Sequence, residues 1–334
     1  MEGKGRTMVT RCSWDGSVRS IVAVAALAAM PFVAEARTAR GAEEVHVGTY
    51  MLRLSSMSMR DHQFSVDFYL WFRWKDDALK PDETFEIVNG TIDHREVLEK
   101  KTIKGMQYSC LRVQATITKY WDIAGYPFDS HDISVEIEDS VSQERELKFV
   151  ADAENVGLDD GFTVTGWRIL NSAASVTSHA YRTNYGDTND PPGQETFYSR
   201  YVHAVSMKRP SVASSVKMFY LPYLATIIAI ASLLVRATNH MPRFGLQMAA
   251  IAAVVIGHLI VASGLPESGQ MTVAEAIHVA AGLTILLTMG ESLLSLKLEE
   301  KSHAASAATV DRVSLVVLVV IFIALNIWAA LAVA

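Results

Sequence analysis

The chain has 334 residues, of which 50% are hydrophobic and 20% are charged, and its formal net charge is −6 at pH 7. This length supports two domains, and the mildly acidic balance argues against nucleic acid as a partner.

The first residues predict a secretory signal peptide over residues 1–36. Arg11 and Arg19 precede an apolar run at 21–34, which ends in a small-x-small cleavage site at 34–36. The alternative is an uncleaved anchor helix; in both cases the region after Arg37 is exported.

Residues 37–216 show the pattern of many short β-strands. Alternating or β-branched runs occur at 64–74, 111–117, 133–137, 162–169 and 198–205, and turn signals separate them. Such spacing predicts an all-β sandwich of the immunoglobulin-like kind. Because Cys12 leaves with the signal peptide, Cys110 is the one thiol of the mature chain, and no internal disulfide is expected.

No catalytic pattern stands out in the exported region. There is no glycine-rich phosphate loop, no metal-ligand spacing and no nucleophile elbow, so we expect neither an enzyme nor a bound cofactor or metal. The histidines of this region are scattered and read as surface or packed residues: His62, His94, His131, His179 and His203.

Residues 217–334 contain four apolar segments, at 218–235, 244–265, 273–296 and 313–334. Each approaches the ~20 residues that cross a bilayer, which predicts an all-α transmembrane domain of four helices. With the large domain outside, the links at 236–243 and 297–312 face the cytoplasm. These links carry Arg and Lys while the outer link at 266–272 carries neither, which agrees with the positive-inside rule.

A short loop points to a family. Tyr126, Pro127, Phe128 and Asp129 form a rigid turn between two predicted strands. This turn resembles the signature loop of the pentameric ligand-gated ion channels, the Cys-loop receptor superfamily, and especially its prokaryotic proton-gated members. Further matches follow in order at 155–157, at 165–167, at Pro222, at 265–266, at 271–272 and at Glu291.

The chain also departs from the family. Lys119 and Ile133 occupy the places of the paired cysteines of animal receptors, as in prokaryotic relatives, and the Trp-x-Pro stretch of the ligand pocket is missing. The resemblance implies a homopentamer in a bacterial inner membrane, with the sandwich in the periplasm. It also implies inorganic ions as permeant species and a small molecule or protons as the ligand.

The resemblance further implies a junction that couples the two domains during gating. Its expected members are Arg60, Asp61, His62, Tyr126, Pro127, Phe128, Asp129, Arg209, Leu265, Pro266 and Glu267. Asp129 and Arg209 are expected to pair near the membrane. The alternative for Arg209 is a membrane-surface charge.

The second apolar segment is the expected pore lining. Residues at alternating steps of four and three share one helical face, and the family turns that face toward the pore. With two residues at the inner mouth, the candidates are Met241, Arg243, Gly245, Ala249, Ala252, Ile256, Leu259 and Ser263. Rings of Ile256 and Leu259 would close the path by dewetting, and a ring of Arg243 would attract anions. Alternatively the small residues only pack helices together, and Arg243 only obeys the positive-inside rule.

The stimulus remains open between protons and a small molecule. Ionisable groups inside membrane segments are candidate proton sensors: His258, Glu275, His278 and Glu291. His258 has the alternative of an interhelical hydrogen bond. A ligand pocket is expected beneath the loop at 182–197, with Tyr181, Arg182, Tyr185, Phe197 and Tyr198 around it. Its aromatic rings suit a cation, whereas Arg182 or Arg200 suits an anion.

Two functions are therefore compatible with the sequence. The first is a pentameric channel gated from the periplasmic side. The second is a membrane-anchored sensory or scaffolding protein of the same fold that conducts no ions.

Overall fold

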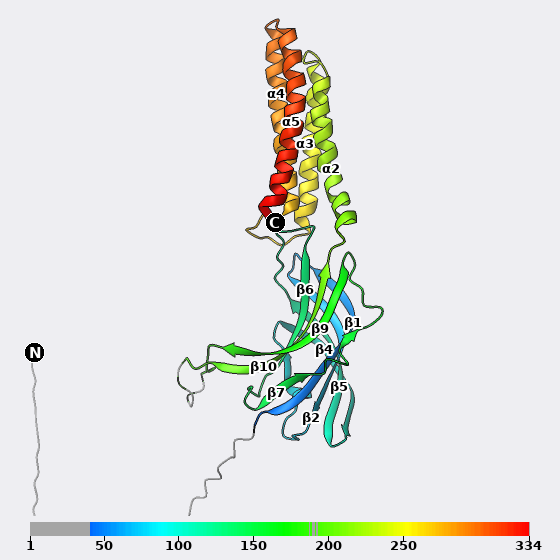
Figure 1. Ribbon diagram of the computed structural model, residues 1–334, viewed down its shortest axis with the longest axis vertical. Coiled ribbons are helices and arrows are strands. Elements are labelled where there is room, and N and C mark those ends of the chain that lie inside the picture. Colours follow the sequence, from blue (N-terminus) through cyan, green and yellow to red (C-terminus); the bar gives the residue numbers. More distant parts are fainter. Residues whose placement is uncertain (1–40, 187, 189–190, 192, 334) are drawn as a thin grey trace, which may run out of the picture. The chain divides into compact units, whose positions relative to one another are not determined.

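The computed structural model describes residues 41–186, 188, 191 and 193–333, all within one compact unit. The predicted signal peptide at residues 1–36 lies outside the described residues. A strand-rich domain comes first, and four long helices follow it (Figure 1).

The strand-rich domain contains two sheets. The six-stranded sheet has the order β4-β5-β2-β1-β7, with β8 also paired to β1. Its strands are β1 (Glu43–Ser58), β2 (Gln63–Trp74), β4 (Gly90–Ile103), β5 (Met106–Thr118), β7 (Leu147–Ala151) and β8 (Gly157–Leu158). The four-stranded sheet has the order β3-β6-β10-β9. Its strands are β3 (Phe85–Ile87), β6 (Ser130–Asp139), β9 (Arg168–Tyr181) and β10 (Thr196–Lys208), and the short helix α1 (Pro81–Thr84) precedes β3.

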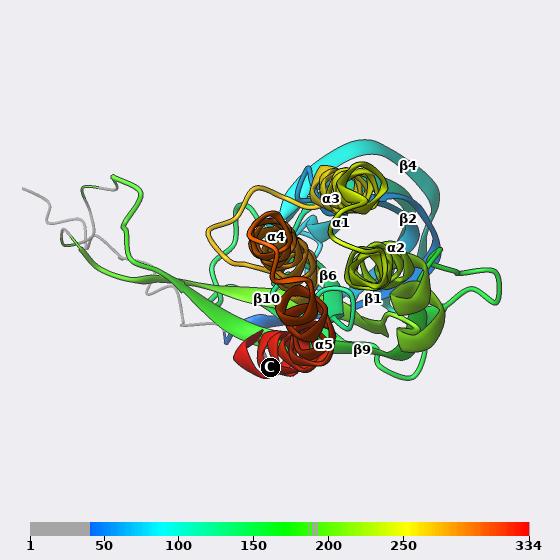
Figure 2. The ribbon, with the colours of Figure 1, turned by 90° about the horizontal axis from the view of Figure 1, so that it is seen from above.

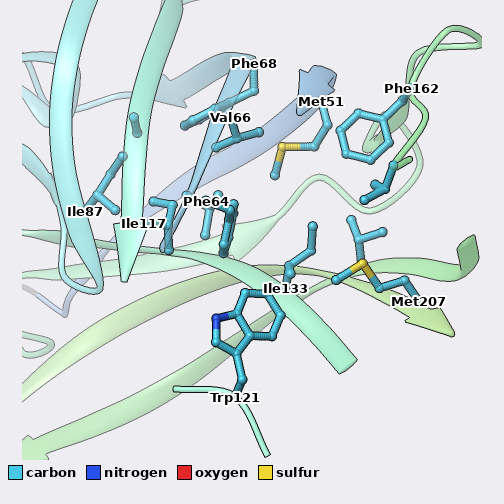
Figure 3. Packing of buried hydrophobic residues seen from close by; sticks show 14 of the residues in the cluster. Met51, Phe64, Val66, Phe68, Ile87, Ile117, Trp121, Ile133, Phe162 and Met207 are labelled. Carbon is cyan, nitrogen blue, oxygen red and sulfur yellow. The ribbon is translucent and has the colours of Figure 1, made fainter. Parts of the chain in front are cut away.

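The period-two pattern explains the core between the sheets. Along β2, Phe64, Val66, Phe68, Leu70, Phe72 and Trp74 are all buried. Ile133 of β6 and Met207 of β10 meet this layer from the other sheet (Figure 3). Each buried side chain of this size stabilises the fold by roughly 2 kcal/mol. The alternation is therefore the main energetic reason for the two-sheet arrangement.

A buried polar chain crosses this core. His203 of β10 contacts Thr49 Oγ1 of β1 through Nδ1 at 2.7 Å and Ser172 Oγ of β9 through Nε2 at 2.8 Å. The hydroxyl of Tyr201 lies 2.8 Å from the same Thr49 oxygen. Burial lowers the pKa of His203 to about 4. The imidazole thus joins the two sheets in its neutral form.

One predicted strand is wrong. Residues 162–167 form a loop with a turn at 165–166, and β9 begins only at Arg168. Phe162 N donates to Asp159 O at 2.8 Å, Trp167 N donates to Val164 O at 2.9 Å, and Gly166 has a φ of +83°. Phe162 and Val164 are nevertheless buried in the core. The apolar alternation here reflects a loop that packs on the sheets, not a strand.

The second half contains α2 (Ser211–Ala231), a 3-10 turn η1 (Ser232–Leu234), α3 (His240–Ser263), α4 (Val273–Glu300) and α5 (Ala304–Val333). All four long helices have the length and hydropathy to cross a membrane, which agrees with the four predicted apolar segments. Seen from above, the four helices run side by side (Figure 2). A capping box of Thr272 and Glu275 defines the start of α4.

Small residues let the helices pack closely. A Cβ on Gly257 of α3 would lie 3.1 Å from His278 Nε2 of α4, so a larger residue would crowd this contact. In α3, Arg243, Gln247, Ala250, Val254, Gly257 and Val261 form the buried stripe. In contrast, the apolar face of α5 is largely exposed.

Candidate functional site

The signature loop leads directly into β6 and is held by an ion pair with the end of β10. Arg209 Nε donates to Asp129 Oδ1 at 2.8 Å, and Arg209 N donates to Asp129 O at 3.2 Å. The second carboxylate oxygen, Oδ2, lies 2.8 Å from His131 Nε2. The Asp129 side chain is buried, with 3% of it exposed, and the Arg209 side chain is partly buried, with 16% exposed. The expected pairing of Asp129 with Arg209 thus forms.

Aromatic rings complete the clamp around Arg209. Its guanidinium lies 4.9 Å from the centroid of Tyr126 and 4.1 Å from that of Trp167. A planar guanidinium stacks on such faces while it donates to a carboxylate. Trp167 has no assigned role in the sequence interpretation, although it belongs to the 165–167 match. The sequence signal that could have marked it is this match itself, because it places a large aromatic residue directly after Gly166.

The charge of Asp129 is stabilised despite its burial. Burial alone raises the pKa of Asp129, but the hydrogen bond from His131 and the charge of Arg209 outweigh this effect and hold the pKa below its usual value. The carboxylate is therefore ionised throughout the range in which proteins normally work.

The same loop contacts the start of α4. Val273 N donates to Ala124 O at 3.1 Å, and Ala274 N donates to Tyr126 O at 3.2 Å. The first N–H groups of a helix have no partner within it, so these two bonds dock α4 on the loop. Phe128 adds a ring contact to Phe219 of α2, with centroids 6.2 Å apart.

The turn between β1 and β2 reaches the helices through Arg60. Its Nη1 donates to Ser263 O at the end of α3, at 3.3 Å. Asp61 instead accepts a hydrogen bond from Ser58 Oγ at 2.6 Å, and the His62 ring packs on Tyr120. Pro266 is buried in the link between α3 and α4. Of the three residues of this turn expected at the junction, Arg60 therefore forms the direct contact with the helices, whereas Asp61 and His62 contact residues of the strand-rich domain.

A second candidate site is a pocket beside the β9–β10 hairpin, with a volume of about 390 Å³. Its lining is Glu86, Glu138, Ser140, Gln143, Tyr181, Asn184, Tyr185, Thr196 and Tyr198. The ring centroids of Tyr181 lie 6.0 Å from Tyr185 and 5.7 Å from Tyr198. Three of the five expected ligand residues therefore line one cavity. Phe197 and Arg182 do not line it.

The charges at this pocket favour a cation. Arg182 is 92% exposed and lies 3.7 Å from Glu195. Arg200 is taken up by carboxylates, with Nε 2.6 Å from Glu138 and Nη1 2.8 Å from Glu136. Burial and the neighbouring carboxylate of Glu138 raise the pKa of Glu86. The acidic side chains line the cavity, whereas the arginines expected to hold an anion are turned outward or already paired.

The α3 face predicted to line the pore is exposed, with one exception. Met241, Gly245, Ala249, Ala252, Ile256, Leu259 and Ser263 are all exposed in the single chain. Arg243 is 1% exposed. Assembly only lowers the exposure of a side chain, so Arg243 cannot form a charged ring in a pore. That part of the prediction is wrong, and with it the argument for anions.

Arg243 is instead enclosed by its own protomer. Its Nη2 donates to Glu291 Oε2 of α4 at 2.6 Å and to Asp311 Oδ1 of α5 at 2.8 Å. Its Nε donates to Ser292 Oγ at 2.8 Å and its Nη1 to Val235 O at 3.2 Å. A buried charge needs such compensation. Asp311 was missed by sequence reasoning, although a carboxylate within a long apolar helix is a signal for a buried cation.

The candidate proton sensors do not form one group. His258 and His278 face each other across α3 and α4, with ring centroids 6.0 Å apart. His278 is 2% exposed, and its Nδ1 donates to Ala274 O at 2.8 Å. Glu275 belongs to the capping box at the start of α4, and Glu291 belongs to the Arg243 cluster.

The two-sheet domain, the four membrane-length helices and the junction loop are the architecture of the pentameric ligand-gated ion channels. This multi-pass membrane protein is a homologue of a proton-gated ion channel from Gloeobacter violaceus. The two are 22% identical over 303 residues, which cover 85% of this chain and 81% of that channel. No protein-family model matches the chain.

Proposed function

We propose that the chain forms a homopentameric ion channel of a bacterial inner membrane, with the strand-rich domain in the periplasm and the pore along α3. The domain layout and the likeness to a proton-gated channel support this proposal. In it, the protein conducts ions and catalyses no reaction. Closed five-fold symmetry would turn each exposed α3 residue into a ring.

The junction carries the argument. The loop at Tyr126 holds the first N–H groups of α4, while Asp129 holds Arg209 at the entry to α2. A displacement of the strand-rich domain therefore acts on two membrane helices at once. A gated channel requires this kind of mechanical link between two packed arrangements.

The pore in this proposal is gated by apolar side chains. Ile256 and Leu259 are 56% and 61% exposed in the single chain. Rings of such side chains exclude water from a narrow path, and their separation restores it. Gly245 and Ala249 make the path wider toward the α2–α3 link, because they carry little or no side chain. In this proposal Arg243 does not select the ion, because its side chain is buried. The choice of ion depends on the side chains at the mouth of the assembled pore.

The stimulus in this proposal is a small organic cation in the tyrosine pocket, or protons. Three tyrosine rings and two carboxylates surround the cavity. Faces of aromatic rings attract a cation, and the carboxylate of Glu86 in the lining adds charge when it is ionised. Protons are the stimulus named for the Gloeobacter homologue. The two stimuli act at different places and can be separated by experiment.

Currents from purified protein test the proposal. The full chain is reconstituted in planar bilayers and exposed to a series of pH values, amines, amino acids and carboxylates, after size analysis has established the pentamer. Gated currents under at least one condition support the channel. Pentamers that stay silent under every condition contradict it.

One observation favours the non-conducting scaffold as a second candidate. With Arg243 withdrawn, the exposed α3 face from Met241 to Ser263 carries no charged side chain among the described residues. Such a face packs helices as readily as it lines a pore. The scaffold predicts ligand binding to the pocket without currents, so binding measured on the silent pentamer would support it.

A further inference from the structure

A buried cluster joins all four membrane helices near the α2–α3 link. Arg243 of α3, Glu291 of α4 and Asp311 of α5 form its charged part. Ser232 at the end of α2 enters through Gln247, whose Nε2 donates to the Ser232 and Ser292 hydroxyl oxygens at 2.8 Å and 2.7 Å. Among the ion pairs of the described residues, the pair of Arg243 with Asp311 is the one that joins α5 to another helix.

The charges of this cluster do not balance. Arg243 supplies one positive charge, while Glu291 and Asp311 supply two carboxylates on the same guanidinium nitrogen. The neighbouring Lys297 and Arg312 are exposed, and within the described part of the chain neither forms an ion pair with the cluster. With both carboxylates ionised, one negative charge would remain uncompensated in a place nearly without water. An uncompensated charge in such a place strongly destabilises the folded state.

One oxygen atom of the cluster has no partner. The side chain of Glu291 is buried, with 8% of it exposed. Its Oε1 makes no hydrogen bond among the described residues. Glu291 Oε2 and Asp311 Oδ1 both approach Arg243 Nη2, so the two carboxyl groups converge. Like carboxylates that share a site retain one proton between them. Glu291 Oε1, which has no hydrogen-bond partner among the described residues, is the oxygen that can carry this proton.

We propose that Glu291 and Asp311 together bind one proton, and that this proton holds α5 against α3 and α4. With the proton bound, the cluster carries one positive and one negative charge and is neutral. Its release leaves a second carboxylate without a cation, and the repulsion loosens α5 from the bundle. The site lies far along the chain from the tyrosine pocket and the signature loop, and it exists whether or not the protein conducts ions.

Infrared spectroscopy of the full chain tests the proton directly. Wild type at neutral pH should show the C=O band of a protonated, buried carboxyl group, and the band should vanish as the pH is raised. Asp311→Asn should remove the band, because Glu291 is then ionised against Arg243, and Glu291→Gln should remove it as well. Glu300→Gln, an exposed carboxyl at the end of α4, is the matched control and should leave the band intact.

Stability against pH gives a second, independent measurement. At pH values where the folded pair still holds its proton but the carboxyl groups of the unfolded chain are ionised, unfolding releases one proton, so the unfolding constant should rise about tenfold per pH unit. The rise should end where the folded pair itself loses the proton. This rise should be absent in Asp311→Asn. Absence of the band in wild type at neutral pH would overturn the proposal, and so would a band that persists in Asp311→Asn. Neither result depends on currents, so a failure here is distinct from a failure of the channel proposal.

Discussion

Arg209 and Asp129 form an ion pair in which a guanidinium is bound by a carboxylate on one side and by the rings of Tyr126 and Trp167 on its faces. The pair lies where β10 passes into α2 and where the signature loop enters β6. It therefore connects the loop that docks α4 with the strand that continues into α2.

Removal of this carboxylate should uncouple the junction. Asp129→Asn leaves the Arg209 charge without its partner in a largely buried place, so we expect a loss of roughly 3 kcal/mol of stability and a strong reduction in gated current. Thermal unfolding in detergent and bilayer recording measure the two effects. Asp132→Asn, an exposed carboxylate on β6, is the control. Unchanged gating in Asp129→Asn would show that the strand-rich domain moves the membrane helices through other contacts.

His203 should make the strand-rich domain sensitive to mild acid. Its pKa is about 4 in the folded protein and 6.5 in an unfolded chain, so the unfolded chain binds more protons between these values. Stability is full above pH 6.5 and falls toward pH 4, by roughly 3 kcal/mol in total. Urea unfolding between pH 7 and pH 4 measures the slope.

The matched variants for this test are His203→Gln and His94→Gln. The first should flatten the pH dependence, because glutamine does not titrate, at the cost of some stability at pH 7. The second changes an exposed histidine on β4 and should keep the wild-type slope. Asp129 acts in a separate window, because its pKa is held below 3.8 and its contribution is lost only at lower pH. Equal slopes in wild type and His203→Gln would contradict the assignment.

The apolar gate should fail when it is made polar. Ile256→Ser and Leu259→Ser would let water remain in the narrow part of the path, so each should raise the current in the absence of stimulus at least tenfold, a change of about 1.4 kcal/mol in the closing equilibrium. Val320→Ser on the exposed face of α5 is the control and should not leak. If Ile256→Ser pentamers do not leak and still gate normally, Ile256 does not form the gate of the pore.

The tyrosine pocket should bind cations through its rings. Tyr185→Ala should weaken the apparent affinity for an organic amine about fivefold, as expected for loss of a cation–π contact of roughly 1 kcal/mol. Phe197→Ala is the control, because Phe197 is exposed on the same hairpin and does not line the cavity. Isothermal titration of the pentamer reports binding without currents. Equal losses in both variants would point to the hairpin fold and not to the pocket.

Sequence reasoning succeeded where local periodicity sets the structure. Alternation along 64–74 predicted β2, and the four apolar runs predicted the four long helices. It failed at 162–167, because a loop that packs on a core shows the same alternation as a strand. The signature loop identified the junction, but the stacking of Trp167 on Arg209 joins residues that are distant along the chain.

The sequence by itself determined the two-part architecture, because burial of alternating side chains and the length of apolar runs depend on neighbours along the chain. Only the tertiary structure decided the environment of Arg243. Its place on a predicted pore helix predicts a charged ring, whereas carboxylates from α4 and α5 enclose it within one protomer. The physical reason is that a buried charge needs partners of opposite charge, and here the partners lie on two other helices. The periodicity of one helix shows which of its own residues share a face, but not which residues of other helices that face meets.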